Sequence, residues 1–296
     1  MQMKTAQDFD QELLILFDAY VHGTLDRRGF LERAQKFAVG GLTAAGLLAA
    51  LSPDFARAQV VPKDDKRITT QMVEYPSSAG NGTMKGYLAK PAGMTGKLPV
   101  IVVIHENRGL NPHIEDIARR LAVDNFVAFA PDALTPLGGY PGDEDKAREL
   151  FAKLDQKKAT EDFVAAANFI KNRPESNGKI GAVGFCYGGG IVHMLAVRMP
   201  ELNAAVPFYG NVPPVADAAK VKAPMQLHFA ETDDRINAAW PAYDAALKAA
   251  GEPHVAYKYP GTQHGFNNDT TPRFDAAAAK QAWGRTMEFF NKNLRA

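Results

Sequence analysis

The chain has 296 residues, of which 46% are hydrophobic and 23% are charged. This composition is that of an ordinary globular protein and excludes wholesale disorder and collagen-like repeats. The formal net charge is +1, so charge gives no overall reason to expect a nucleic-acid partner. The single cysteine, Cys186, excludes an intramolecular disulfide and a zinc ribbon. A lone thiol is usually a small buried hydrophobe, so its neighbours in the sequence must decide whether it is reactive.

The first sixty residues contain the features of an export signal. Arg27 and Arg28 precede a Phe-Leu pair, which resembles the twin-arginine export motif. Residues 37–53 carry no charge, but they are too few and too rich in glycine to predict a membrane span. Residues 56–58 (Ala-Arg-Ala) then offer the small-x-small pattern of a cleavage site. These features predict twin-arginine export to the periplasm, with a mature chain that begins near Gln59.

A second interpretation of the same segment stays open. Apolar residues recur at helical spacing before Gly23 and predict an amphipathic helix, which export signals seldom carry; these residues are Phe9, Leu13, Leu14, Leu16, Phe17 and Tyr20. In this alternative, two helices are retained as an N-terminal arm of a cytoplasmic protein. Residues 1–61 are therefore expected to be either a signal or a helical extension.

From residue 62 onward, apolar strands alternate with amphipathic helices. Strands are predicted at residues 98–105, 126–130, 179–185, 202–208, 225–230 and 255–259. Helices are predicted at residues 114–124, 144–172 (in one or two pieces), 188–199, 239–250 and 274–293. This alternation predicts an α/β fold with a mainly parallel sheet, helices on both faces and ligands beyond the carboxyl ends of the strands. Residues 62–296 are expected to form one domain.

The junction at Cys186 fits a nucleophile elbow in which cysteine replaces serine. Residues 184–190 read Gly-Phe-Cys-Tyr-Gly-Gly-Gly, between a predicted strand and a predicted helix. Glycines on either side allow the close chain approach that such a turn needs. The thiol would lie at a helix N-terminus, where the dipole favours thiolate. A dinucleotide-binding loop is excluded because the G-x-G-x-x-G spacing is not met.

The partners of such a nucleophile follow it in the order acid, then histidine. Asp233 lies in a loop after a predicted strand and is the favoured acid, with Asp234 as its competitor. His264 is flanked by glycine in the loop after the last predicted strand, downstream of the acid. The sequence therefore predicts a triad of Cys186, Asp233 and His264.

An earlier loop supplies the remaining elements of the predicted site. Residues 105–109 read His-Glu-Asn-Arg-Gly at the end of a strand. In this type of site the oxyanion is bound by the backbone N–H after the nucleophile and by another from this early loop, which here assigns Tyr187 and Asn107. The pair His105-Glu106 does not continue into an H-E-x-x-H metal motif, so no metal is expected.

Taken in order, these motifs resemble the dienelactone hydrolase (carboxymethylenebutenolidase) family, cysteine members of the α/β-hydrolase fold. The resemblance extends over residues 62–296. It implies that Cys186 is the nucleophile, that His264 is the base and acid, and that Asp233 orients it. It also implies that Glu106 contacts the cysteine and helps to generate thiolate when substrate arrives.

The chain departs from this family where substrate is bound. The family holds a substrate carboxylate with arginines after the third strand and after the catalytic histidine, and neither segment contains arginine here. Arg108, Tyr140 and Phe266 are the predicted substrate contacts instead. We expect a hydrolase of activated, small-molecule esters or lactones that acts through a thioester and needs no cofactor. The alternatives are a thioesterase or other acyl-transfer enzyme, or a non-catalytic scaffold.

Overall fold

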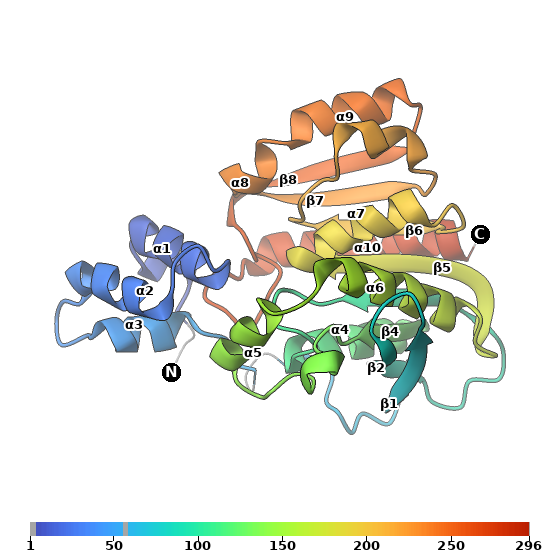
Figure 1. The fold of residues 1–296 in the computed structure, drawn as a ribbon, viewed down its shortest axis with the longest axis horizontal. Coiled ribbons are helices and arrows are strands. Elements are labelled where there is room, and N and C mark those ends of the chain that lie inside the picture. The colour runs from blue at the N-terminus through green and yellow to red at the C-terminus, as the bar shows by residue number, and fades with distance from the viewer. Residues whose placement is uncertain (1–3, 56–58, 296) are drawn as a thin grey trace.

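The computed structural model describes residues 4–55 and 59–295. Eight strands form one sheet in the order β1-β2-β4-β3-β5-β6-β7-β8 (Figure 1). The bounds are β1 Ile68–Ser77, β2 Gly82–Pro91, β3 Leu98–Ile104, β4 Val127–Pro131, β5 Ser176–Phe185, β6 Ala204–Phe208, β7 Met225–Thr232 and β8 His254–Gln263. Strands β4, β3, β5, β6, β7 and β8 are parallel neighbours. The predicted mainly parallel sheet is confirmed.

The sequence analysis missed the antiparallel edge of this sheet. Strand β1 pairs with β2, and β2 pairs with β4, both in antiparallel register. Along β1 only Ile68, Tyr75 and Ser77 are buried. An edge strand with so few buried side chains gives no continuous apolar run, which is why the pattern was not recognised.

Helices cover both faces of the sheet. The helices of residues 62–295 are α4 Pro112–Val123, α5 Glu144–Phe151, α6 Gln156–Lys171, α7 Tyr187–Arg198, α8 Asp234–Asn237, α9 Trp240–Ala249 and α10 Ala276–Leu294. The predicted helix over residues 144–172 is two helices, α5 and α6. Short 3-10 segments lie at Thr135–Leu137 and Val215–Lys220.

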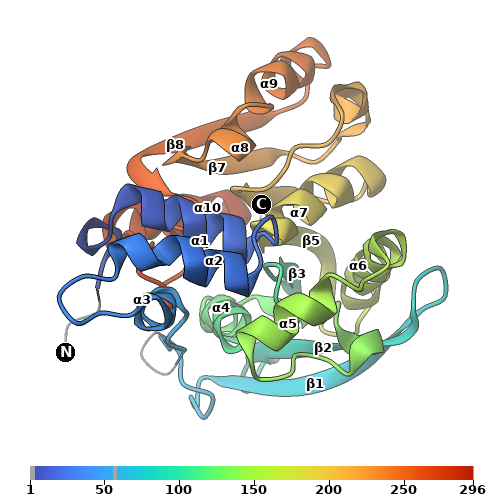
Figure 2. The same ribbon diagram turned by 60° about the vertical axis from the view of Figure 1, so that its left-hand side comes forward.

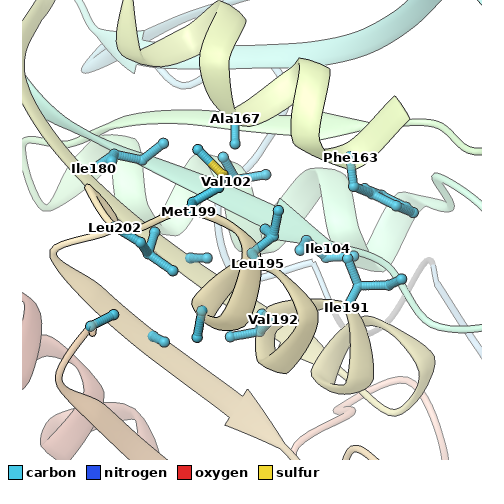
Figure 3. Packing of buried hydrophobic residues seen from close by; sticks show 14 of the residues in the cluster. Val102, Ile104, Phe163, Ala167, Ile180, Ile191, Val192, Leu195, Met199 and Leu202 are labelled. Atoms are coloured by element: carbon cyan, nitrogen blue, oxygen red, sulfur yellow. The ribbon is translucent and has the colours of Figure 1, made fainter. Parts of the chain in front are cut away.

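Two apolar clusters, one on each face, hold these layers together. Strand β3 shows the alternation: Val102 and Ile104 belong to the cluster that includes side chains of α6, α7 and α9, whereas Ile101 and Val103 belong to the cluster that includes side chains of α4 and α10. Figure 3 shows part of the first cluster, including Val102, Ile104, Phe163, Ala167, Leu195 and Met199. Successive side chains of a strand point to opposite faces, so a strand buried on both sides reads as a continuous apolar run.

The N-terminal residues form a small helical unit of their own, here called the N-terminal helical unit (residues 4–55). It contains α1 Gln11–Val21, α2 Arg27–Ala34 and α3 Ala44–Leu51, with 3-10 segments at Ala6–Asp8 and Gln35–Phe37. The side chains of Asp10 and Asp26 cap the first two α-helices. Apolar side chains from all three α-helices pack into a separate core; its members include Leu13, Leu14, Phe17, Phe30, Leu47 and Leu51.

The N-terminal helical unit lies at the end of the sheet where the parallel strands finish (Figures 1 and 2). It contains Arg27 and Arg28 at the start of α2, and the uncharged stretch predicted from sequence includes α3. The predicted cleavage motif at residues 56–58 lies outside the described residues. Among the residues that the structure describes, no helix has both the length and the apolar character needed to cross a membrane.

Candidate active site

Cys186 occupies a sharp turn between β5 and α7. Its backbone has φ 54° and ψ −113°, a conformation that costs energy for a residue with a side chain. A Cβ on Gly184 would lie 2.2 Å from the carbonyl oxygen of Gly188, and a Cβ on Gly188 would lie 2.3 Å from that of Ile104. Both positions therefore require glycine. The turn places Cys186 at the N-terminus of α7, where the helix dipole favours a negative sulfur.

The side chains of His264 and Asp233 lie beside this turn. The Nδ1 of His264 is 2.6 Å from the Oδ2 of Asp233, and both residues are 5% exposed. Asp234, the competing acid, is exposed in α8. One ring nitrogen of His264 and the Sγ of Cys186 lie within 4.8 Å of each other. Because Nδ1 is engaged by Asp233, Nε2 is the nitrogen left to face the sulfur.

The electrostatics of this group favour a charged imidazole. Burial disfavours the positive charge on His264, but the negative charge of Cys186 and the hydrogen bond to Asp233 outweigh it and raise the pKa of His264 to about 10. The raised pKa favours a protonated imidazole beside the sulfur of Cys186. The ring of Tyr209 packs against that of His264, with 4.9 Å between the centroids.

The loop after β3 lies on the other side of Cys186. Asn268 donates a hydrogen bond from Nδ2 to the Oε2 of Glu106 at 2.8 Å, which fixes that carboxylate. Asn107 and Arg108 both line the same cavity as Cys186. The His105 ring accepts a hydrogen bond from the backbone N–H of Ala133 at its Nε2, 3.1 Å away, so it serves the fold.

The cavity over Cys186 is small and is closed partly by the N-terminal helical unit. It holds about 50 Å³ of accessible space. Phe17, Tyr20 and Val21 of that unit line it together with Glu106, Asn107, Arg108, Cys186, His264 and Arg273. Two arginines, Arg108 and Arg273, lie in this wall. Neither lies in the two segments where the family's substrate-binding arginines are expected.

Two predicted substrate contacts lie elsewhere. Phe266 is fully buried and packs against Tyr259 and Tyr209, with ring centroids 4.9 and 5.5 Å away, so it is a core residue. Tyr140 lines a different hollow, and its hydroxyl donates to the Oε1 of Glu144 at 2.8 Å. Tyr140 reaches the cavity only through Glu144, which does line it. Neither residue lines the cavity over Cys186, so their contact with substrate stays a prediction.

Sequence reasoning also missed a set of contacts that the N-terminal helical unit makes with the site. The carbonyl oxygen of Val21 accepts hydrogen bonds from Asn107 Nδ2 at 2.8 Å and from Arg108 Nη2 at 3.2 Å. Asp18 Oδ1 lies 3.0 Å from Arg273 Nη1. The rings of His22 and His264 meet edge to face, with 4.9 Å between their centroids. No local motif marks these residues, because their partners lie at least 86 positions away in sequence.

These features together define an α/β-hydrolase. They are a mainly parallel eight-stranded sheet, a cysteine on a glycine-flanked turn from strand to helix, and an acid–histidine pair from later loops. A model of the dienelactone hydrolase family matches residues 84–294, and the chain belongs to that family. A model described as YqhI-like matches residues 1–39.

Individual relatives agree with this placement. The chain is 32% identical over 263 residues to a putative carboxymethylenebutenolidase of Escherichia coli K12, covering 84% of this chain and 95% of that protein. It is 51% identical over 114 residues to the putative hydrolase fragment YghX of the same organism, covering 38% of this chain and 97% of the fragment. A crystal structure of a putative dienelactone hydrolase from Klebsiella pneumoniae superposes with a TM-score of 0.66 at 27% identity, covering 76% of this chain and 99% of that one.

Proposed function

We propose that this protein hydrolyses activated esters or lactones by nucleophilic catalysis at Cys186. The observation that carries the proposal is the position of His264. Its ring is held at Nδ1 by Asp233 and offers Nε2 to the sulfur on the elbow. This is the arrangement of nucleophile, base and orienting acid that nucleophilic acyl transfer requires.

The proposed reaction has two steps. In the first step the Cys186 sulfur attacks the substrate carbonyl, and the backbone N–H groups of Tyr187 and Asn107 stabilise the tetrahedral oxyanion. Each such donor is typically worth about 10²–10³ in rate. The C–O bond to the leaving group then breaks, His264 protonates the departing oxygen, and a thioester remains on Cys186.

In the second step His264 takes a proton from water, and the hydroxide attacks the thioester. The C–S bond breaks, the acid product leaves and the thiolate is restored. Asp233 keeps the imidazole in the tautomer that presents Nε2 to both steps. Enol or phenol esters favour the first step, because enolates and phenolates are good leaving groups.

Glu106 is proposed as an auxiliary acid of this site. Its carboxylate lines the same cavity as Cys186 and is held at one oxygen by Asn268. A carboxylate fixed there repels a thiolate until a substrate intervenes, which fits a role in adjusting the charge of the nucleophile.

The cavity favours small acyl groups. Its accessible space of about 50 Å³ is only a few water molecules in size. The wall that limits it comes from Phe17, Tyr20 and Val21, so the N-terminal helical unit sets the size limit. Arg108 and Arg273 supply positive charge in the same wall, although Asp18 and the Val21 carbonyl already occupy part of their donor capacity.

We propose further that the N-terminal helical unit stays attached to the working enzyme. This proposal is supported by the hydrogen bonds to Val21 and by the ion pair of Arg27 with Asp145 at 2.6 Å. Intact-protein mass spectrometry of the active enzyme tests it, on both the periplasmic and the cytoplasmic fraction. The full-length mass supports retention, and a mass that begins near Gln59 supports export with cleavage instead.

A panel of p-nitrophenyl esters and matched acyl thioesters, assayed with the wild type and Cys186→Ala, tests the proposed reaction. We expect measurable ester hydrolysis that falls to background in the variant. Turnover of thioesters alone would favour a thioesterase. Turnover that survives in the variant would refute the nucleophile, and no turnover of either panel would favour a non-catalytic scaffold.

A further inference from the structure

Three potential metal-binding side chains meet above the elbow, and one of them comes from the N-terminal helical unit. The Sγ of Cys186 and one ring nitrogen each of His22 and His264 all lie within 4.8 Å of one another. His22 directly follows α1, whose last residue is Val21. The reaction proposed above makes no use of His22.

The donor set is of the kind that zinc binds. Thiolate sulfur and imidazole nitrogen are both zinc ligands, and zinc sites with three protein ligands keep a fourth position open. Zinc bonds of about 2.0–2.3 Å place neighbouring ligand atoms about 3.3–3.6 Å apart. The three groups therefore need to move together by no more than about an ångström to enclose an ion.

Carboxylates outside the cluster already orient both imidazoles. Asp233 holds the Nδ1 of His264, and the Nε2 of that ring is buried with no hydrogen-bond partner among the described residues. Asp18 Oδ1 lies 3.3 Å from the Nε2 of His22, so Nδ1 is the nitrogen of this ring that we assign to the metal. A histidine whose second nitrogen is held by a carboxylate is the usual form of a metal-binding histidine.

The charges around the cluster are of both signs. Arg235 approaches the same Nε2 of His22 at 3.3 Å and Arg273 pairs with Asp18, so cations stand behind the ring as well. Asp18, Asp233 and the thiolate supply the negative charge that compensates a divalent ion.

We propose that Cys186, His264 and His22 form a zinc site that reversibly switches the hydrolase off. Zinc binds the sulfur and the Nε2 of His264, and the proton of the imidazolium is released to solvent. The metal thereby removes both the nucleophile and the base while it is bound. The loss of activity rests on the proposed function, whereas the binding of the ion does not.

The site joins two parts of the chain that match different families. His22 lies within the YqhI-like segment, residues 1–39, and the other two ligands lie within the dienelactone hydrolase segment, residues 84–294. A cysteine–histidine pair alone provides two ligands, and the N-terminal helical unit provides the third. The response to zinc is therefore a property that the N-terminal helical unit adds to the catalytic domain.

Cobalt(II) titration of the full-length protein tests binding without relying on activity. We expect a thiolate-to-cobalt charge-transfer band in the near ultraviolet and the intense visible bands of a tetrahedral site, both displaced by one equivalent of zinc. Cys186→Ala should lose the charge-transfer band. The absence of that band from the wild-type protein would overturn the proposal, whether or not the protein hydrolyses esters.

The third ligand is tested with His22→Ala and the milder His22→Gln. His254→Ala is the matched control, because His254 is also paired with a carboxylate, Asp244, at 2.9 Å, but lies at the start of β8. We expect the His22 variants to bind zinc at least 100-fold more weakly, beyond the roughly 10–100-fold that loss of an outer-shell partner costs. The control should bind as the wild type does.

Inhibition by zinc, measured relative to each variant's own activity without metal, should shift by the same factor. Equal zinc affinity in the wild type and in a folded His22 variant would show that only the cysteine–histidine pair binds, and would overturn the three-ligand site. If both His22 variants fail to fold, Asp18→Asn gives the second measurement, with an expected weakening of about 10–100-fold; unchanged zinc affinity in that variant would count against the site.

Discussion

The glycines of the elbow make an energetic prediction that can be worked out from the structure. In Gly188→Ala, the new methyl group would lie 2.3 Å from the carbonyl oxygen of Ile104 and 2.7 Å from that of His105. The first distance is 0.7 Å shorter than the 3.0 Å that real Cβ atoms keep. Both obstacles are backbone atoms, one at the last residue of β3 and one directly after it, so neither can rotate away as a side chain can. We expect the free energy of unfolding to fall by about 3 kcal/mol, the upper end of typical overpacking costs.

Gly190→Ala is the matched control in the same helix. Its new methyl group would lie 3.5 Å from the nearest atom, the carbonyl oxygen of Asn211, which is an ordinary contact. Alanine is favoured over glycine in a helix by up to about 1 kcal/mol, so this variant should be as stable as the wild type or slightly more so.

Urea denaturation and ester hydrolysis provide the two measurements for this pair. The loss of about 3 kcal/mol is read as the difference between the unfolding free energies of the two proteins, extrapolated to zero urea. Displacing the nucleophile by about 1 Å should also reduce kcat/KM by about 100-fold. Equal stability of the two variants would refute the argument that close packing at the elbow requires glycine at position 188.

Three further predictions concern the acid, the cavity and pH. Asp233→Asn should lower kcat by about 10⁴-fold, the loss typical when the orienting acid is replaced. Asp234→Asn should change kcat little, because that side chain is exposed. Equal losses in steady-state kinetics would contradict the assignment of Asp233 as the acid. Tyr20→Ala should raise the hexanoate-to-acetate ratio of kcat/KM by at least about tenfold, and Ile15→Ala, on the same helix but 59% exposed, should not. The pKa of His264 is raised from 6.5 to about 10, so its contribution to stability is complete below pH 6.5 and is lost as the pH rises through 10. Across this pH range the unfolding free energy of His264→Gln should therefore fall less steeply than that of the wild type. Equal slopes would contradict the raised pKa.

Most of the fold could be predicted from the sequence, because buried parallel strands appear in it as continuous apolar runs. The strand that ends at Ile104 is a run of β-branched residues, and the glycines around Cys186 mark a turn that few other structures need. Strand β1 could not be predicted in the same way, because its exposed edge position leaves its sequence mixed.

The site itself divides into a predictable and an unpredictable part. Asp233 could be singled out because chain order and loop position constrain the acid. The contacts of Asp18 and His22 could not, because they join the end of the first helix to residues more than 200 positions later, Arg273 and Arg235. The position of Phe266, two residues after the histidine, favours a substrate contact in the sequence, but in the structure its ring packs in the core against three aromatic rings, those of Phe208, Tyr209 and Tyr259.

The most direct test of the central claim is to find the acyl group on Cys186. The wild-type protein is mixed with excess p-nitrophenyl acetate, quenched in acid within the first turnovers, digested and analysed by mass spectrometry. The account predicts an acetyl group on the peptide that contains Cys186, released by hydroxylamine at neutral pH as a thioester is, and absent from Cys186→Ala. Acetylation confined to another residue during turnover, or hydrolysis that continues in the alanine variant, would contradict it.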